Sequence, residues 1–255
     1  MSLGQADAHG PRCEMSSAAP LIVALDGPAG AGKSTVARMV AERAGLSLVD
    51  TGAIYRTVAL LALKQGISVD DGAALGLIAG TLPSRLRFVV EGGINRVFLD
   101  AEQGTWSTEE LSASIRSPEV SAAASSVARH PAVRAALLHL QRTLGRRGKG
   151  SVLEGRDIGT VVFPDADVKV FVTASPSQRA FRRINELREK GLDQGETHAT
   201  VLRDILARDA QDEQRVEAPL RAADDAVVVD TTDKTLVQVT DEVLALVEMA
   251  LHKGR

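Results

Sequence analysis

Short runs of consecutive apolar residues alternate along the chain with longer segments in which apolar residues recur every three or four positions. The first run, LIVALD at 21–26, is apolar up to its last residue, which is typical of a strand buried on both faces of a parallel sheet. The segment 34–45 then has helical spacing and ends at Gly45, a common helix-terminating residue. This order predicts βαβ units, in which helices cover both faces of a parallel sheet.

Four more runs of strand type follow, so the sequence predicts a five-stranded sheet. These expected strands span 46–50, 151–155, 168–174 and 226–232. Helical spacing returns over 54–66, and an amphipathic segment over 237–253 predicts a final helix. We therefore expect a three-layer α/β fold with the parallel sheet at its centre.

Two stretches interrupt this alternation. Over 85–106, two segments with alternating apolar residues flank a turn-like EGGIN, a pattern that predicts a β-hairpin. Helical sequence rich in alanine and serine follows, and together these segments predict a small insertion over 85–145. The second stretch, 176–217, consists of two helical segments dense in arginine and acidic residues. The remaining sequence, 21–84 and 146–255, is expected to form the core domain, which carries this second stretch.

Composition and charge narrow the class of protein. A single cysteine, Cys13, excludes a disulfide framework and a cysteine-based zinc site. No apolar run approaches the ~18 residues that a membrane span needs, and residues 1–20, interpreted as a disordered leader, lack the pattern of a signal peptide. A net charge of -3 with 3% aromatic residues argues against a nucleic-acid surface. We therefore expect a cytoplasmic protein that binds small molecules and, since no apolar stripe requires a partner, a monomer.

The turn after the first predicted strand has the residues of a phosphate-binding loop. Its pattern, a glycine, four residues and then Gly-Lys-Ser, matches the P-loop of nucleotide-binding proteins. Glycines allow successive N–H groups to point inward, and the start of the following helix adds its positive dipole end. We expect ATP to bind through Gly27, Pro28, Ala29, Gly30, Ala31, Gly32, Lys33, Ser34 and Thr35.

Three side chains of this loop have distinct expected roles. Lys33 is expected to reach the β- and γ-phosphates, Thr35 to donate a hydrogen bond to the α-phosphate, and the Ser34 hydroxyl to bind Mg²⁺. The alternative, a glycine-rich turn without a ligand, is disfavoured by the buried strand before it and the helix after it. The chain lacks the Asn-Lys-x-Asp run of a GTPase and the Asp-Glu strand end of a motor ATPase. By elimination, the sequence indicates a small kinase.

A second group of polar residues is expected on the same rim of the sheet. Thr51 and Arg56 follow the second predicted strand, and Arg156 and Asp157 follow the third. Because ligands bind at the carboxyl ends of parallel strands, these side chains are expected to converge near the P-loop. Arginine there suits a second phosphate, since its fork binds oxyanions in a bidentate way. The alternative is a structural ion pair between Arg156 and Asp157.

The third group lies in the arginine-rich stretch. Arg208, Asp212 and Arg215 are spaced four and three residues apart and are expected to share one helix face. Three further arginines lie upstream, at Arg179, Arg182 and Arg183. Composition alone favours two solvated helices with intrahelical ion pairs. The functional alternative is a mobile arginine lid that closes over the phosphates and excludes water.

Four runs, in this order, resemble those of a known family: GPAGAGKST, VDTGAIYR, EGRDIGTVVFPDA and RDAQDEQRVEAPL. From about Leu21 to its C-terminus, the chain resembles the bacterial cytidylate kinases. The resemblance implies a P-loop NTPase-type fold with an insertion that binds the nucleoside monophosphate (NMP) and a short helical lid. It also implies Mg²⁺-dependent phosphoryl transfer from ATP to CMP or dCMP, which gives ADP and CDP or dCDP.

The resemblance also assigns the acceptor site residue by residue. The acceptor phosphate would be held by Arg56, Arg156 and Arg215. Cytosine would be read by Thr51, Arg134 and Asp157, and the ribose would contact Ser125, Arg208 and Asp212. Thr51 stands where many members have serine, and the stretch QGTWSTEELSASIR is longer than is typical of the family.

Catalysis at such a site depends on positioning and positive charge, because the acceptor is already an anionic phosphate and needs no strong base. We therefore expect the largest catalytic losses at Lys33, Arg156 and Arg215, with Arg182 and Arg183 as lid candidates. Two alternatives stay open. Another small P-loop kinase would phosphorylate UMP, dTMP, AMP or shikimate, and an ATP-binding switch protein would transfer no phosphate.

Overall fold

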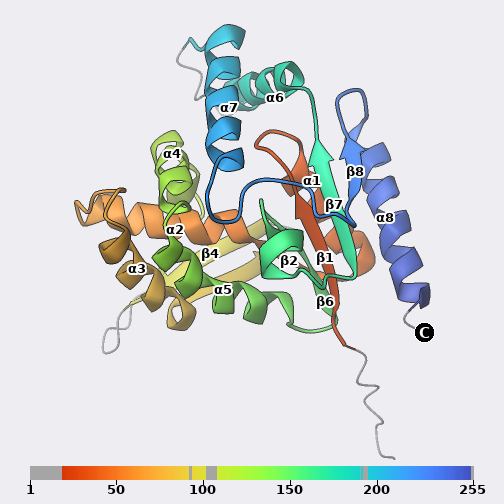
Figure 1. Ribbon diagram of the computed structural model, residues 1–255, viewed down its shortest axis with the longest axis horizontal. Helices are drawn as coiled ribbons and strands as arrows, with labels where there is room; N and C mark the ends of the chain where they lie inside the picture. The colour runs from red at the N-terminus through yellow and green to blue at the C-terminus, as the bar shows by residue number, and fades with distance from the viewer. Residues whose placement is uncertain (1–18, 92–93, 102–107, 190, 192–194, 254–255) are drawn as a thin grey trace, which may run out of the picture.

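The computed structural model describes residues 19–91, 94–101, 108–189, 191 and 195–253 (Figure 1). A five-stranded parallel sheet occupies its centre, as predicted, and its strand order is β2-β6-β1-β7-β8. Its strands are β1 (Leu21–Asp26), β2 (Ser47–Asp50), β6 (Gly150–Glu154), β7 (Val168–Thr173) and β8 (Val227–Asp230). The expected leader lies outside the described residues, except for its last two positions.

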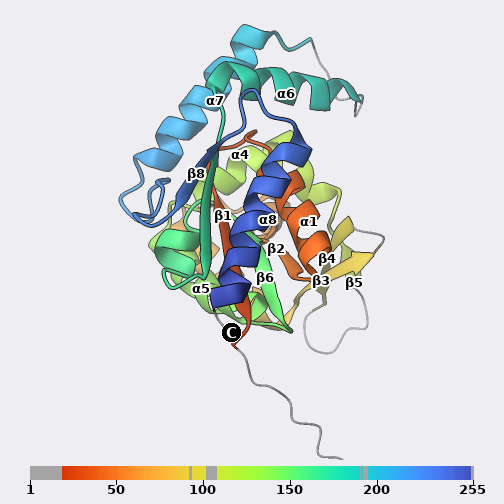
Figure 2. The same ribbon diagram turned by 90° about the vertical axis from the view of Figure 1, so that its right-hand side faces the viewer.

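Helices cover both faces of this sheet (Figures 1 and 2). Ile22 and Ala24 of β1 belong to one hydrophobic cluster, and Val23 and Leu25 belong to another. The first cluster includes α2 (Thr51–Lys64) and α5 (Pro131–Gly145), and the second includes α1 (Lys33–Ala44) and α8 (Leu236–Lys253). A strand buried on both faces needs a helical layer on each side, so the predicted three-layer α/β fold is confirmed.

A second, antiparallel sheet has the strand order β3-β4-β5. Its strands are β3 (Leu86–Glu91), β4 (Ile94–Asp100) and β5 (Thr108–Glu110). The first two strands form the predicted hairpin. The third was not predicted, because Thr-Glu-Glu is exposed and offers no apolar position that would mark a strand.

Two further helices, α3 (Gly72–Thr81) and α4 (Pro118–Val127), and two short 3-10 turns, η1 (Leu82–Ser84) and η2 (Ser114–Arg116), flank this small sheet in the chain. Helix α3 was not predicted, because its sequence GAALGLIAGT is apolar nearly throughout and shows little helical periodicity. It packs against α5, so contacts cross position 85. The expected boundaries of the insertion therefore stay predictions.

Helices α6 (Pro176–Glu189) and α7 (His198–Glu213) project beyond the carboxyl ends of the central strands (Figure 1). They pack on each other through Ala180, Ile184, Val201 and Ile205. A capping box of Thr197 and Thr200 begins α7. Within the part of the chain that the structure describes, we find no helix with the length and apolar character of a membrane span.

Candidate active site

The P-loop connects the end of β1 to the start of α1. Gly27, Gly30 and Gly32 have φ angles of 142°, 76° and 88°, which favour glycine. A Cβ atom at Gly27 would lie 1.9 Å from the carbonyl oxygen of Val172, so only glycine fits there. The loop therefore packs closely on β7 and presents the N-terminus of α1, where N–H groups without helical partners favour an anion.

Lys33 lies buried in this loop, and its Nζ donates a hydrogen bond of 2.6 Å to the carbonyl oxygen of Pro28. Burial lowers the pKa of Lys33 well below its usual value, and the positive charge of Arg156 lowers it further. The carboxylates of Glu154 and Asp26 act in the opposite direction. A phosphate in the loop would add the negative charge that favours a buried ammonium group.

Glu154, the last residue of β6, connects the P-loop to the start of α2. The Ser34 hydroxyl donates to its carboxylate across 2.7 Å, and the Thr51 hydroxyl donates to its backbone carbonyl oxygen, also across 2.7 Å. Burial raises the pKa of Glu154 to about 7, and the negative charge of Asp50 contributes to this rise. The sequence pattern does not single out Glu154, because an Asp-Glu strand end is the expected signature and here a single carboxylate ends the run SVLE.

The oxygen atoms of Ser34 and Glu154 are the kind of ligand that Mg²⁺ prefers, so these residues fit the expected ion. The described residues contain no group of three or more His, Cys, Asp or Glu side chains that could hold a metal. A Mg²⁺ ion here would therefore take its other ligands from phosphate and water, and this ion usually keeps several of its waters.

Asp26, the last residue of β1, holds the turn that follows β6. Its carboxylate accepts hydrogen bonds from the backbone N–H groups of Ile158 and Gly159, across 2.8 and 2.7 Å. Burial raises the pKa of Asp26 to about 6. Arg156 and Asp157 lie in this turn, just before the single π-helical turn η3 (Ile158–Val162), so Asp26 helps to set their position. Asp26 was not predicted, because its partners are more than 130 residues away in the chain.

Four arginines converge around the carboxylate of Asp212 and the adjoining rim of the sheet. Arg156 donates to Asp212 across 3.0 Å, and Arg215 donates to the other oxygen of the same carboxylate. Arg208 lies partly buried beside them. Burial lowers the pKa of Arg208 to about 10, with further lowering by the positive charges of Arg156, Arg56 and Arg215. This part of the site is therefore rich in positive charge.

Three of these arginines, Arg56, Arg208 and Arg215, have a buried Nε atom without a hydrogen-bond partner among the described residues. Arg56 also forms an ion pair with Asp50, across 2.7 Å. Leaving buried donors unpaired costs free energy, and the carboxylate of Asp212 is shared between two guanidinium groups. An oxyanion placed among these side chains would supply both the missing acceptors and the missing charge.

The expectation that Arg208, Asp212 and Arg215 share one helix face is wrong for Arg215, because α7 ends at Glu213. Arg215 reaches the cluster from the following segment through its ion pair with Asp212. The interpretation as solvated helices also fails for Asp212, whose side chain is 3% exposed and is paired with Arg156 from another element.

Asp157 pairs with Arg134 of α5 in a buried ion pair. The guanidinium carbon of Arg134 lies 6.0 Å from the centre of the Tyr55 ring. Because Arg156 pairs with Asp212 and Asp157 with Arg134, the alternative of a structural Arg156–Asp157 pair is wrong.

Two more of the expected acceptor residues are buried close to these pairs in the fold. Ser125 lies on α4, which packs on α2 and contacts α7, and Thr51 begins α2. These helix contacts and the ion pairs described above therefore bring α2, α4, α5, α7 and the turn after β6 together.

The two predicted lid arginines have different surroundings. Arg182 donates to the hydroxyl and the backbone carbonyl oxygen of Thr231, across 2.9 and 2.5 Å, and the Thr231 hydroxyl donates to the carbonyl oxygen of Ala31 in the P-loop. Arg183 pairs with Glu186 on its own helix, where both side chains are partly exposed. The structure thus places Arg182 next to the P-loop and Arg183 on the surface of α6.

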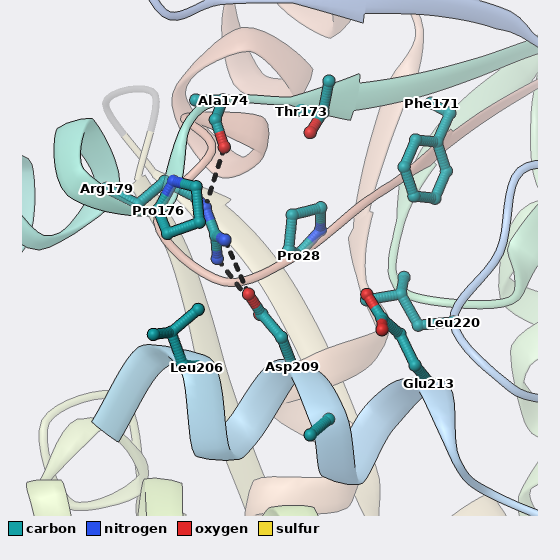
Figure 3. Close-up of a pocket in the computed structure, with 11 residues that line it drawn as sticks. Pro28, Phe171, Thr173, Ala174, Pro176, Arg179, Leu206, Asp209, Glu213 and Leu220 are labelled. Atoms are coloured by element: carbon teal, nitrogen blue, oxygen red, sulfur yellow. Dashed lines mark hydrogen bonds and ion pairs between the residues drawn. The ribbon is translucent and has the colours of Figure 1, made fainter. Parts of the chain in front are cut away.

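A cavity of about 460 Å³ lies between Pro28, the end of β7 and helix α7 (Figure 3). Its lining includes Phe171, Leu206 and Leu220, and the ion pair of Arg179 with Asp209. Arg179 was grouped with the possible lid arginines, but its ion pair with Asp209 was not predicted, because an arginine-rich and acid-rich segment offers many possible partners at similar spacing.

Comparison with known proteins agrees with this geometry. The profile of a family described as "Cytidylate kinase" matches residues 23–249. A cytidylate kinase from Actinobacillus succinogenes is 43% identical over 234 residues, which cover 89% of this chain and 98% of the relative. The cytidylate kinase of Geobacter sulfurreducens is 46% identical over 229 residues, which cover 89% of this chain and 92% of the relative. With a P-loop beside an arginine-lined second site and matches over nearly all of the described sequence, this chain belongs to the cytidylate kinase family.

Proposed function

We propose that the protein transfers the γ-phosphoryl group of ATP to CMP or dCMP and releases ADP with CDP or dCDP. The observation that carries this proposal is the group of three unpaired Nε atoms on Arg56, Arg208 and Arg215, next to the P-loop. One phosphate site would serve an ATP-binding switch protein, whereas a kinase for a phosphorylated acceptor needs two. The family to which the chain belongs supports CMP as the acceptor over UMP, dTMP, AMP and shikimate.

On the donor side, residues 27–35 would cradle the phosphates of ATP. Lys33 would place positive charge on the β- and γ-phosphates, and Thr35 would donate to the α-phosphate. Ser34, with Glu154 at its side, would hold Mg²⁺, which neutralises charge on the phosphates when bound. The hydrogen bond between Ser34 and Glu154 keeps the serine hydroxyl at this position.

On the acceptor side, Arg56, Arg156 and Arg215 would bind the phosphate of CMP. Its negative charge would compete with the carboxylate of Asp212 for Arg156 and Arg215, so both guanidinium groups can turn toward the phosphate. We propose that Ser125, Arg208 and Asp212 then contact the ribose. This exchange of partners would couple binding of the acceptor to the position of the segment after α7.

Cytosine has an amino group that donates and ring atoms that accept hydrogen bonds. We propose that the carboxylate of Asp157 accepts from the amino group, while Arg134 donates to the ring and Thr51 supplies a hydroxyl. The buried Arg134–Asp157 pair holds both groups in place before the base arrives. Uracil carries a carbonyl oxygen in place of the amino group. This oxygen and the carboxylate of Asp157 would both be acceptors with no hydrogen between them, which disfavours UMP.

Positioning and positive charge would do most of the catalysis. With both nucleotides bound, the phosphate oxygen of CMP would attack the γ-phosphorus in line, and Lys33, Arg156 and Arg215 would stabilise the charge on the transferred group. We propose that residues 85–145 form the NMP-binding insertion and 176–217 the lid, in which Arg182 and Arg183 approach the phosphates on closure. The expectations of a cytoplasmic monomer that binds no nucleic acid stay predictions.

An assay of ADP release tests the proposal, with ATP and Mg²⁺ and with CMP, dCMP, UMP, dTMP, AMP and shikimate as separate acceptors. We expect rapid turnover with CMP and dCMP and little with the others. Preference for another acceptor would keep the P-loop kinase and remove the base assignment. ADP release that does not depend on any of the acceptors would contradict the function itself.

A further inference from the structure

Arg179 connects three segments at the base of the α6–α7 pair. Its Nη1 donates to the carbonyl oxygen of Ala29 in the P-loop across 3.1 Å, and its Nε donates to the carbonyl oxygen of Ala174 across 3.0 Å. Its two terminal nitrogens also donate to the carboxylate of Asp209 on α7, across 3.0 and 2.5 Å (Figure 3). The Arg179 and Asp209 side chains are only 4% and 12% exposed. A buried fork of this kind has a fixed geometry, so it sets the position of α7 relative to the P-loop.

The P-loop and α6 are also in close contact at this point. A Cβ atom at Gly30 would lie 3.2 Å from the Cβ atom of Arg179. The backbone of the loop thus packs on the first turn of α6, from which the side chain of Arg179 extends to α7. Any displacement of α6 here would disturb the P-loop.

Helix α7 presents different residues to the cavity next to β7 and to the acceptor site. Asp209, Leu206 and Glu213 line the cavity next to β7, whereas Asp212 accepts from Arg156 in the acceptor site. Arg208, the neighbour of Asp209 in the chain, belongs to the group of arginines around Asp212. The position of Asp209 therefore determines where the acceptor side of the helix lies.

We propose that Arg179 and Asp209 are positioning residues for phosphoryl transfer. Their ion pair fixes α7 on the P-loop and so places Arg208 and Asp212 against the acceptor nucleotide. The inference rests on the proposed function, which gives Arg208 and Asp212 their contacts with CMP. Phosphates that order the P-loop would also stabilise α7 through this pair, and by linkage an acceptor held by α7 would strengthen ATP binding by the same factor.

Steady-state kinetics of Asp209→Asn and Arg179→Lys test the pair. Each variant keeps a polar group at its position but loses the bidentate charged contact. For Asp209→Asn we expect the KM for CMP to rise about tenfold. The Kd for ATP measured without CMP is expected to stay within about twofold, because the bond from Arg179 to Ala29 remains. The KM for CMP of the double variant is expected to be no higher than that of the more impaired single variant, since the two residues act as one unit.

Ile205→Val is the matched control, because Ile205 is a buried residue of α7 that packs on α6 and has an apolar side chain, so its truncation removes no charge or hydrogen bond from the pair. It is expected to lower the melting temperature while the KM for CMP stays within about twofold of the wild type. An equal rise of KM in this control would mean that the pair acts only through stability. Either variant, if it folds and has an unchanged KM for CMP, would overturn the proposal. Arg179→Lys keeps a positive charge opposite Asp209, so it provides the test if Asp209→Asn does not fold.

Hydrogen exchange of the α7 amides provides a readout that needs no turnover. With Mg²⁺ and a non-hydrolysable ATP analogue alone, exchange in α7 is expected to slow several-fold in the wild type and to change little in Asp209→Asn. No slowing in the wild type would contradict the link between the P-loop and α7. If the wild type phosphorylates no acceptor, the proposed function is wrong. The exchange experiment still decides whether the pair connects the P-loop and α7.

Discussion

The hydroxyl of Ser34 in the P-loop donates a 2.7 Å hydrogen bond to the carboxylate of Glu154 on the neighbouring strand β6. The contact joins residues 120 positions apart in the chain. It is possible because β1 and β6 are adjacent and parallel, so their carboxyl ends lie side by side. A titratable carboxylate therefore sits directly beside the serine expected to bind Mg²⁺.

Activation by Mg²⁺ is expected to depend on pH through Glu154. Burial raises the pKa of this carboxyl to about 7, so it is largely protonated at about pH 6 and ionised at about pH 8. Only the ionised form attracts the cation, so the Mg²⁺ concentration for half-maximal rate is expected to be several-fold lower at the higher pH. In Glu154→Gln this difference is expected to disappear. The measurement is a Mg²⁺ titration of the rate at both pH values, and the same pH dependence in wild type and variant would contradict the role of Glu154.

Replacing Arg215 by alanine is expected to reduce turnover by about two orders of magnitude or more, because a guanidinium group that stabilises the transferred phosphoryl group is lost. Folding is expected to stay intact, since Asp212 keeps its ion pair with Arg156. Turnover with CMP and the melting temperature measure the two effects. Arg221→Ala is the control in the same segment, because Arg221 is 63% exposed and pairs only weakly, at 3.9 Å, with Asp224. Near-normal turnover of the Arg215 variant would remove this residue from the proposed catalytic group.

Asp157→Asn is expected to weaken discrimination between CMP and UMP. The carboxylate accepts only, whereas an asparagine side chain can also donate to the carbonyl oxygen that uracil carries in place of the amino group of cytosine. The ratio of kcat/KM for CMP to that for UMP is expected to fall about tenfold or more. Initial rates with both acceptors measure it, and an unchanged ratio would show that another residue reads this edge of the base.

The free energy of unfolding is expected to fall as pH rises through the range in which Asp26 ionises. Its pKa is raised from 3.8 to about 6 in the folded protein, so the folded state holds the proton more tightly than the unfolded chain. The favourable contribution of the protonated form is present below about pH 4 and is lost as pH rises through about 6, on the order of 3 kcal/mol in total. Glu154, whose pKa is also raised, adds a loss of the same sign.

Urea unfolding of wild type and Asp26→Asn at about pH 4.5 and about pH 7.5 isolates this contribution. The asparagine cannot ionise, so the stability of the variant relative to wild type is expected to be greater at the higher pH. Asp241→Asn serves as a surface control, because its side chain is half exposed and pairs with exposed Arg43. An equal difference between Asp26→Asn and wild type at both pH values would contradict the prediction.

Much of the fold could be predicted because it depends on local patterns. The run LIVALD is apolar on both sides and predicts a doubly buried strand, and the structure divides its residues between two hydrophobic clusters. The glycines of the P-loop could be predicted from their spacing. Helix α3 and strand β5 could not, because an almost uniformly apolar decapeptide and three exposed polar residues carry no period that distinguishes one structure from another.

The sequence by itself determined the five strands of the central sheet, where the P-loop lies, and which arginines, threonines and aspartates follow the strands. Only the tertiary structure decided their partners: Asp157 pairs with Arg134 rather than with Arg156, Arg156 pairs with Asp212, and Arg179 pairs with Asp209. The same holds for the buried carboxyls of Asp26 and Glu154, which act on segments more than a hundred residues away. The physical reason is that hydrophobic periodicity specifies which side of a segment is buried, whereas a pair of charges also needs the order and register of the strands that bring its two members together.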